Sequence, residues 1–193
     1  MTTTNWIQVT LKVIETLDAL GVSYVICGSV ASIVHGIVRT TIDTDLIADL
    51  KLEHVKPFVT ALENEFYVEQ ESMYEAINFH RSFNIIHKET MFKVDVFIPK
   101  VRLFDQDQLA HRVEVEIAQD PKRMAWIASA EDNVLAKLEW FRMGNEVSER
   151  QWRDVLGVLK TQSGNLDVEY MHKAAQALSV SDLLERALEE SEK

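Results

Sequence analysis

Three aspartates in two short strand-like segments have the types and spacing of a divalent-metal site. Asp43 and Asp45 are two residues apart, and Asp95 lies in the alternating segment 92–98. Side chains two residues apart on a strand point to the same face, about 6–7 Å from each other. Carboxylate oxygens are the ligands that Mg²⁺ prefers. The pattern therefore predicts a site at which these carboxylates share one or two magnesium ions.

In segment 92–98, Asp95 is expected on the opposite face of the strand from the valines. Alternation places Val94 and Val96 on one face of a strand and leaves Asp95 on the other, between Lys93 and Phe97. An isolated charge in an apolar strand is very costly, so pairing or metal coordination is expected. The ordinary alternative stays open as well, because a chain with 31 acidic residues produces Asp-x-Asp spacings on solvated surfaces.

The segment before these aspartates predicts an anion site. Residues 24–27 are a short apolar run typical of a buried strand, and residues 30–35 are typical of a helix. Gly28 and Ser29 stand at the turn between them. Free N–H groups at a helix start favour phosphate, and glycine permits close approach of the backbone. The turn is therefore a candidate phosphate-binding loop.

Residues 28–45 together resemble a known signature. Gly28-Ser29-x-Ala31-x-x-x-His35-Gly36-x-x-Arg39-x-Thr41-x-Asp43-x-Asp45 is similar to the motif of the nucleotidyltransferase superfamily, which includes DNA polymerase beta-like and AbiEii-type proteins. Further blocks at 82–87, 92–95, 137–140 and 151–156 resemble uncharacterised bacterial members, so the resemblance covers residues 20–190. Thr44 departs from it, because an apolar residue is common there.

The resemblance implies a reaction and a role for each residue. Asp43 and Asp45 would bind two Mg²⁺ ions, and Asp95 would complete the acceptor-side metal or receive the hydroxyl proton. Gly28 and Ser29 would hold the β- and γ-phosphates of an NTP, with ATP among the expected nucleotides. The product would be an NMP-modified acceptor, which is a small molecule, a protein or RNA, together with pyrophosphate.

Two cations complete the expected nucleotide site. The resemblance places Arg39 just before the metal-binding strand, and Lys137 belongs to a helical cap that borders the cleft in such proteins. Each has a structural alternative: Arg39 as an ion-pair partner of Asp43 or Asp45, and Lys137 as a solvated or paired surface charge.

Composition limits the class of protein. Of 193 residues, 47% are hydrophobic, which indicates a globular chain. Neither an 18-residue apolar run nor a signal-peptide pattern is found, and the single cysteine excludes an internal disulfide, so we expect a cytoplasmic protein with no membrane partner. A net charge of −11 argues against non-specific nucleic-acid binding. A homodimer stays open.

The periodicity predicts alternating helices and strands followed by a helical C-terminal part. The resemblance implies an α+β fold with a nucleotidyltransferase-like mixed β-sheet flanked by helices. We expect an α/β core over residues 1–128 and a C-terminal cap of four helices over residues 129–193. The expected core elements are helices at 6–20 and 52–65, a strand at 43–48, a hairpin of 78–87 with 91–98, a strand at 113–117 and an edge strand at 124–128. Two alternatives share this fold: a non-catalytic nucleotide-binding protein, and an interaction module of the toxin–antitoxin kind.

Overall fold

A computed structural model describes residues 6–38, 40–119 and 121–192. The chain divides into two compact units. The first contains the described residues up to Cys27 and those from Thr41 to Ile127. The second contains the described residues from Gly28 to Thr40 and from Ala128 onward.

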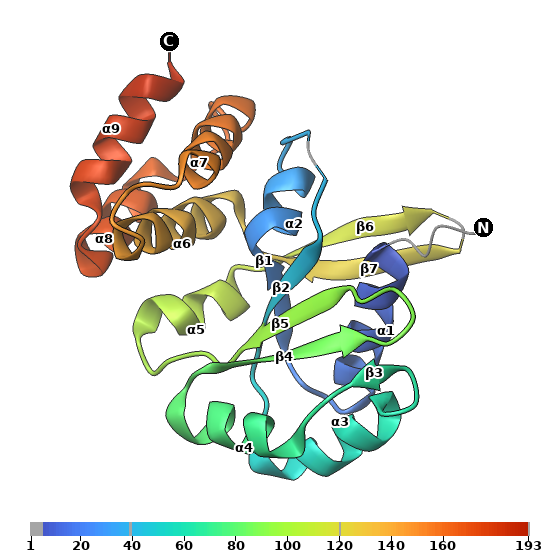
Figure 1. The fold of residues 1–193 in the computed structure, drawn as a ribbon. Helices are drawn as coiled ribbons and strands as arrows, with labels where there is room; N and C mark the ends of the chain where they lie inside the picture. The colour runs from blue at the N-terminus through green and yellow to red at the C-terminus, as the bar shows by residue number, and fades with distance from the viewer. Residues whose placement is uncertain (1–5, 39, 120, 193) are drawn as a thin grey trace. The chain divides into compact units, whose positions relative to one another are not determined.

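A mixed sheet forms the first unit (Figure 1). Its seven described strands have the order β3-β4-β5-β2-β1-β7-β6. Strand β2 is antiparallel to β1 and parallel to β5. The strands are β1 (Tyr24–Cys27), β2 (Asp43–Ala48), β3 (Phe66–Tyr67), β4 (Ser82–His87), β5 (Lys93–Phe97), β6 (Val113–Gln119) and β7 (Lys122–Ile127).

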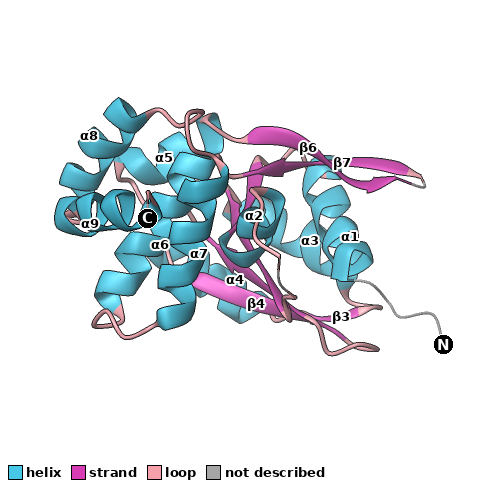
Figure 2. Ribbon diagram, turned by 90° about the horizontal axis from the view of Figure 1, so that it is seen from above, coloured by secondary structure: helices cyan, strands magenta, loops and turns pink. Residues whose placement is uncertain are grey.

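Helices cover one face of this sheet. Helix α1 (Trp6–Ala19) buries Val9, Val13 and Leu17, at the helical spacing expected from the sequence, and packs against α3 (Val55–Leu62). A 3₁₀ turn, η1 (Leu52–His54), leads into α3. The views in Figures 1 and 2 show α1 and α3 side by side. The residues of β2 and β5 whose side chains point to the other face of the sheet are therefore not packed against these helices, and they can be polar.

Three parts of the first unit differ from the expectation. Helix α4 (Gln70–Phe79) takes the first residues of the expected hairpin arm, and the His80 cap (φ 48°) turns the chain into β4. Helix α5 (Leu103–Ala110) was not expected. The edge-strand prediction for 124–128 was wrong, because β7 lies between β1 and β6 and leaves β6 at the edge.

The second unit is helical. It contains α2 (Gly28–Val34), α6 (Ala130–Met143), α7 (Glu149–Thr161), α8 (Val168–Leu178) and α9 (Ser181–Ser191). Serine side chains cap the starts of α6 and α7: Ser129 accepts from the Asp132 N–H, and Ser148 accepts from the Gln151 N–H. The four expected C-terminal helices are thus confirmed. In the part of the chain that the structure describes, no helix has the length and apolarity needed to cross a bilayer.

Candidate active site

The three aspartates lie on one face of two neighbouring strands. In the parallel pairing of β2 with β5, Asp43 is opposite Lys93 and Asp45 is opposite Asp95. Side chains two residues apart share a face, so these four positions form the corners of a rectangle about 5 Å across the strands and 7 Å along them. We call them the carboxylate rectangle. All four are partly exposed, whereas Thr44 and Val94 between them are buried.

Lys93 occupies the fourth corner of the carboxylate rectangle. Its Nζ lies 2.6 Å from Asp95 Oδ2, with the lysine side chain 42% exposed and the aspartate 19% exposed. The hydrogen bond to Asp95 raises the pKa of the Lys93 ammonium, burial opposes it, and the charges of Asp95, Asp43 and Asp45 add to the rise. The rectangle therefore holds three carboxylates and one ammonium.

The donor set suits a hard divalent cation. All three acidic groups are carboxylates on adjacent strands of one face, which is the ligand chemistry that Mg²⁺ takes. As the side chains stand, no three His, Cys, Asp or Glu residues among those described converge as ligands of one ion. The Lys93 ammonium contacts one oxygen of Asp95 that a metal could otherwise coordinate.

Two threonines position β2. The Thr41 hydroxyl lies 2.9 Å from the Asp43 carbonyl oxygen and 3.1 Å from Asp43 Oδ1, at the start of the strand. On the helix-covered face, Thr44 is fully buried and its Oγ1 lies 2.9 Å from Thr10 Oγ1 of α1. A buried hydroxyl needs such a partner. Thr10 thus explains how a polar residue is accommodated where the resemblance has an apolar one.

The expected phosphate loop begins α2. Gly28 follows β1 directly and has a φ of +61°, a left-handed conformation that favours glycine. Ser29 is the next residue and is buried. Ser32 donates to the Gly28 carbonyl at 3.1 Å and accepts from the Asn133 amide at 3.0 Å, so α2 is tied to α6. Phosphate binding at Gly28 and Ser29 stays a prediction. Arg39 lies outside the described residues.

Lys137 lies inside the helical unit. Its Nζ is 2.9 Å from Asp154 Oδ2 of α7, and the two side chains are only 9% and 6% exposed. This is the paired alternative named for Lys137, although the pair is buried rather than on the surface. Nucleotide binding by Lys137 stays a prediction. It would require the Lys137 ammonium to contact both Asp154 and a phosphate.

Sequence reasoning did not assign two of these residues. Lys93 could have been found, because alternation in 92–98 places it on the face of Asp95, two residues away. Asp154 had no comparable signal, since it meets Lys137 across two helices, 17 residues along the chain. His35, also part of the motif, contacts the Ala128 carbonyl oxygen through Nε2 at 2.7 Å, which is a structural contact.

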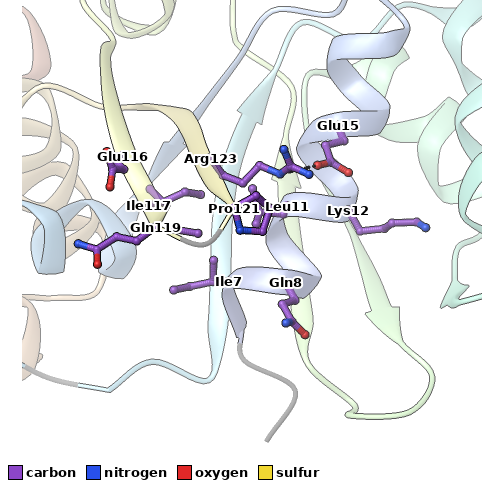
Figure 3. Close-up of a pocket in the computed structure, with 11 residues that line it drawn as sticks. Ile7, Gln8, Leu11, Lys12, Glu15, Glu116, Ile117, Gln119, Pro121 and Arg123 are labelled. Atoms are coloured by element: carbon purple, nitrogen blue, oxygen red, sulfur yellow. Dashed lines mark ion pairs between the residues drawn. The ribbon is translucent and has the colours of Figure 1, made fainter. Parts of the chain in front are cut away.

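A separate groove lies between α1 and the β6–β7 hairpin (Figure 3). Its volume is about 710 Å³, and its lining residues include none of the carboxylate rectangle. Ile7, Leu11 and Ile117 supply apolar surface, and an ion pair between Arg123 and Glu15, 3.4 Å long, joins the hairpin to the helix. Residues of α1 line the groove. The carboxylate rectangle lies on the other face of β2, away from Thr10 of α1.

Comparison with known proteins identifies the fold. No protein-family model and no curated protein sequence matches the chain. Several solved structures are similar to it, and three of them are described here. The antibiotic-resistance factor ANT(2'')-Ia aligns with a TM-score of 0.55 at 15% identity, over 93% of this chain and 95% of that one.

An antigenic nucleotidyltransferase-like protein from Paracoccidioides brasiliensis aligns with a TM-score of 0.53 at 16% identity, over 93% of this chain and 91% of that one. The lincomycin-bound lincosamide antibiotic adenylyltransferase LnuA aligns with a TM-score of 0.50 at 15% identity, over 77% of this chain and 93% of that one. The expected fold is confirmed: the chain has a nucleotidyltransferase-like fold, with a mixed sheet flanked by helices.

Proposed function

We propose that the chain is a metal-dependent nucleotidyltransferase that moves an NMP from an NTP to a hydroxyl acceptor. The observation that carries the proposal is the carboxylate rectangle, in which Asp43, Asp45 and Asp95 share one face of adjacent strands. Its occurrence within a nucleotidyltransferase-like fold supports the same reaction class. Fold alone does not identify the acceptor, because one scaffold serves many substrates.

Asp43, Asp45 and Asp95 are the residues proposed to hold Mg²⁺. The bound ions would supply charge neutralisation at the triphosphate and acidify the acceptor hydroxyl. The Thr41 hydroxyl fixes the Asp43 carboxylate at the strand start, and the Thr10–Thr44 contact fixes the strand between the two aspartates. Both contacts reduce the reorganisation required of β2 when ligands bind.

Asp95 is proposed to orient the acceptor and take its proton. It lies directly opposite Asp45 and is mostly shielded from solvent, at 19% exposure. A carboxylate in this position accepts a hydrogen bond from the attacking hydroxyl, which is the requirement for a general base. Gly28, Ser29, Arg39 and Lys137 are the proposed nucleotide-binding residues, with the backbone N–H groups of the Gly28 turn directed to phosphate.

Transfer of the nucleotide label tests the reaction. The purified chain is incubated with α-labelled NTP and Mg²⁺ in the presence of separated small-molecule, protein and RNA fractions, and label transfer and pyrophosphate release are measured together. We expect label transfer and pyrophosphate release in one fraction, and a loss of at least about 100-fold in Asp95→Asn, as for removal of a general base. The control is Asp49→Asn, an exposed carboxylate just after β2 that pairs with Lys51. An equal rate in Asp95→Asn would contradict the proposed role.

Similar structures set the first acceptors to try. LnuA is described as a lincosamide antibiotic adenylyltransferase and was solved with lincomycin, and ANT(2'')-Ia is described as an antibiotic-resistance factor. At 15% identity, these likenesses concern the fold and leave the acceptor of this chain open. Hydroxyl-rich antibiotics therefore join the small-molecule fraction as one arm of the same assay.

A further inference from the structure

Lys93 occupies the position in the carboxylate rectangle at which a further metal ligand would complete the set. It is the register partner of Asp43 across the strands and the same-face neighbour of Asp95 along its own strand. Its ammonium contacts Asp95 Oδ2 at 2.6 Å, and the charges of all three aspartates act on it. Of the four groups in the carboxylate rectangle, Lys93 is the only cation.

This ammonium and a divalent cation have conflicting requirements. A Mg²⁺ ion coordinates carboxylate oxygens at about 2.0–2.1 Å and needs near-octahedral space around it. The ammonium already takes Asp95 Oδ2, and two cations on one carboxylate repel each other at short range. The Lys93 side chain is 42% exposed, so its long stem has solvent into which the ammonium can turn.

We infer that the Lys93 ammonium and a divalent cation on Asp95 exclude each other, so that Lys93 is the internal counter-ion of the metal-free site. The inference rests on the proposed function, because it requires that the aspartates bind metal. Without metal, Lys93 offsets repulsion among three carboxylates that adjoining strands force together. When metal binds, Lys93 leaves Asp95, and the energy of that ion pair is subtracted from the binding energy of the metal.

Two consequences separate this role from a general structural one. Lys93→Met should lower the melting temperature of the metal-free protein, since the three carboxylates then lack a counter-ion. The same variant should bind Mg²⁺ more tightly than the wild type, by about tenfold, because no pair has to be broken. A residue that merely supported the fold would weaken metal binding when replaced.

The chain contains a matched control for this substitution. Lys12 pairs with Glu65 at 2.8 Å and is 46% exposed, close to Lys93 in both contact length and exposure. Lys12→Met removes an equivalent ion pair away from the carboxylate rectangle. Lys93→Arg keeps the positive charge and should retain wild-type metal affinity to within a few fold.

The test is calorimetric titration of Mg²⁺, and of Mn²⁺ as a second probe, into the metal-stripped full chain and these three variants, with circular dichroism to confirm folding. Tighter binding by Lys93→Met alone, with Lys93→Arg and Lys12→Met near wild type, is the expected result. Equal or weaker binding by Lys93→Met overturns the inference and leaves the proposed metal site intact. No binding by the wild type or by any variant overturns both the inference and the metal-dependent function.

Discussion

Replacing one member of the buried Lys137–Asp154 pair should destabilise the helical unit strongly. Replacing Asp154 leaves the Lys137 ammonium without this carboxylate in a poorly solvated position, and breaking a buried pair from one side costs about 3–5 kcal/mol. The side chains are 9% and 6% exposed, so water can stabilise the remaining charge only slightly. We therefore expect Lys137→Met and Asp154→Ala each to lower the free energy of unfolding by about 3 kcal/mol.

The double variant gives the sharper result. Lys137→Met/Asp154→Ala removes both charges, and an apolar replacement of a buried pair is often close to neutral. The cavity left by the aspartate should account for most of the remaining loss, about 1–2 kcal/mol. The double variant should thus be more stable than either single variant, and the coupling between the sites should be about 4 kcal/mol.

Equilibrium denaturant unfolding of the four proteins measures this coupling. The control is the Lys173–Glu169 pair, which is shorter, at 2.6 Å, but has side chains that are 74% and 81% exposed. Its loss should change stability by less than about 0.5 kcal/mol. Additive losses in the Lys137–Asp154 cycle would refute the reasoning. If Lys137 also binds nucleotide, the double variant recovers stability without recovering NTP affinity.

Three further outcomes follow from individual contacts. Thr44→Val should destabilise by about 1–3 kcal/mol by stranding the Thr10 hydroxyl, and Thr10→Val/Thr44→Val should recover most of it; a double variant no better than the single one would contradict this. Gly36→Ala should lower stability by about 2 kcal/mol or more, since φ is +112° and its Cβ would lie 2.3 Å from Thr161 Cγ2; an unchanged melting temperature would be contrary evidence. Burial raises the pKa of Tyr24 to about 12. Between its ordinary value of 10.0 and that value, the unfolded chain loses the phenol proton first, so stability falls as pH rises. Tyr24→Phe should remove about 2 kcal/mol of that fall, and identical pH profiles would argue against it.

Local patterns in the sequence were sufficient for much of the fold. Alternation in 92–98 placed Val94 and Val96 in the core and Asp95 on the other face, because strand geometry depends only on neighbouring residues. The helix caps at Ser129 and Ser148 are local in the same way, since each serine accepts a hydrogen bond from within the first turn of its helix. These features need no information from distant parts of the chain.

The features that sequence reasoning missed depend on distant contacts or weak patterns. Strand β7 is interior because it pairs with β1, about 100 residues earlier in the chain. No local pattern in residues 122–127 indicates this pairing. Helix α5 buries only Phe104 and Gln108, so its apolar periodicity is faint. The same limit applies to the site: the Thr10–Thr44 and Lys137–Asp154 contacts join residues 34 and 17 positions apart.

Asp43, Asp45 and Asp95 are proposed to form a metal-dependent nucleotide site. Its most direct test is calorimetric titration of each of the four NTPs into the purified chain, with and without Mg²⁺, repeated on Asp43→Ala and on the control Asp49→Ala. We expect NTP binding that requires Mg²⁺, is lost in Asp43→Ala and is kept in Asp49→Ala. Absence of binding by every NTP under both conditions, or binding that Asp43→Ala leaves unchanged, would contradict it.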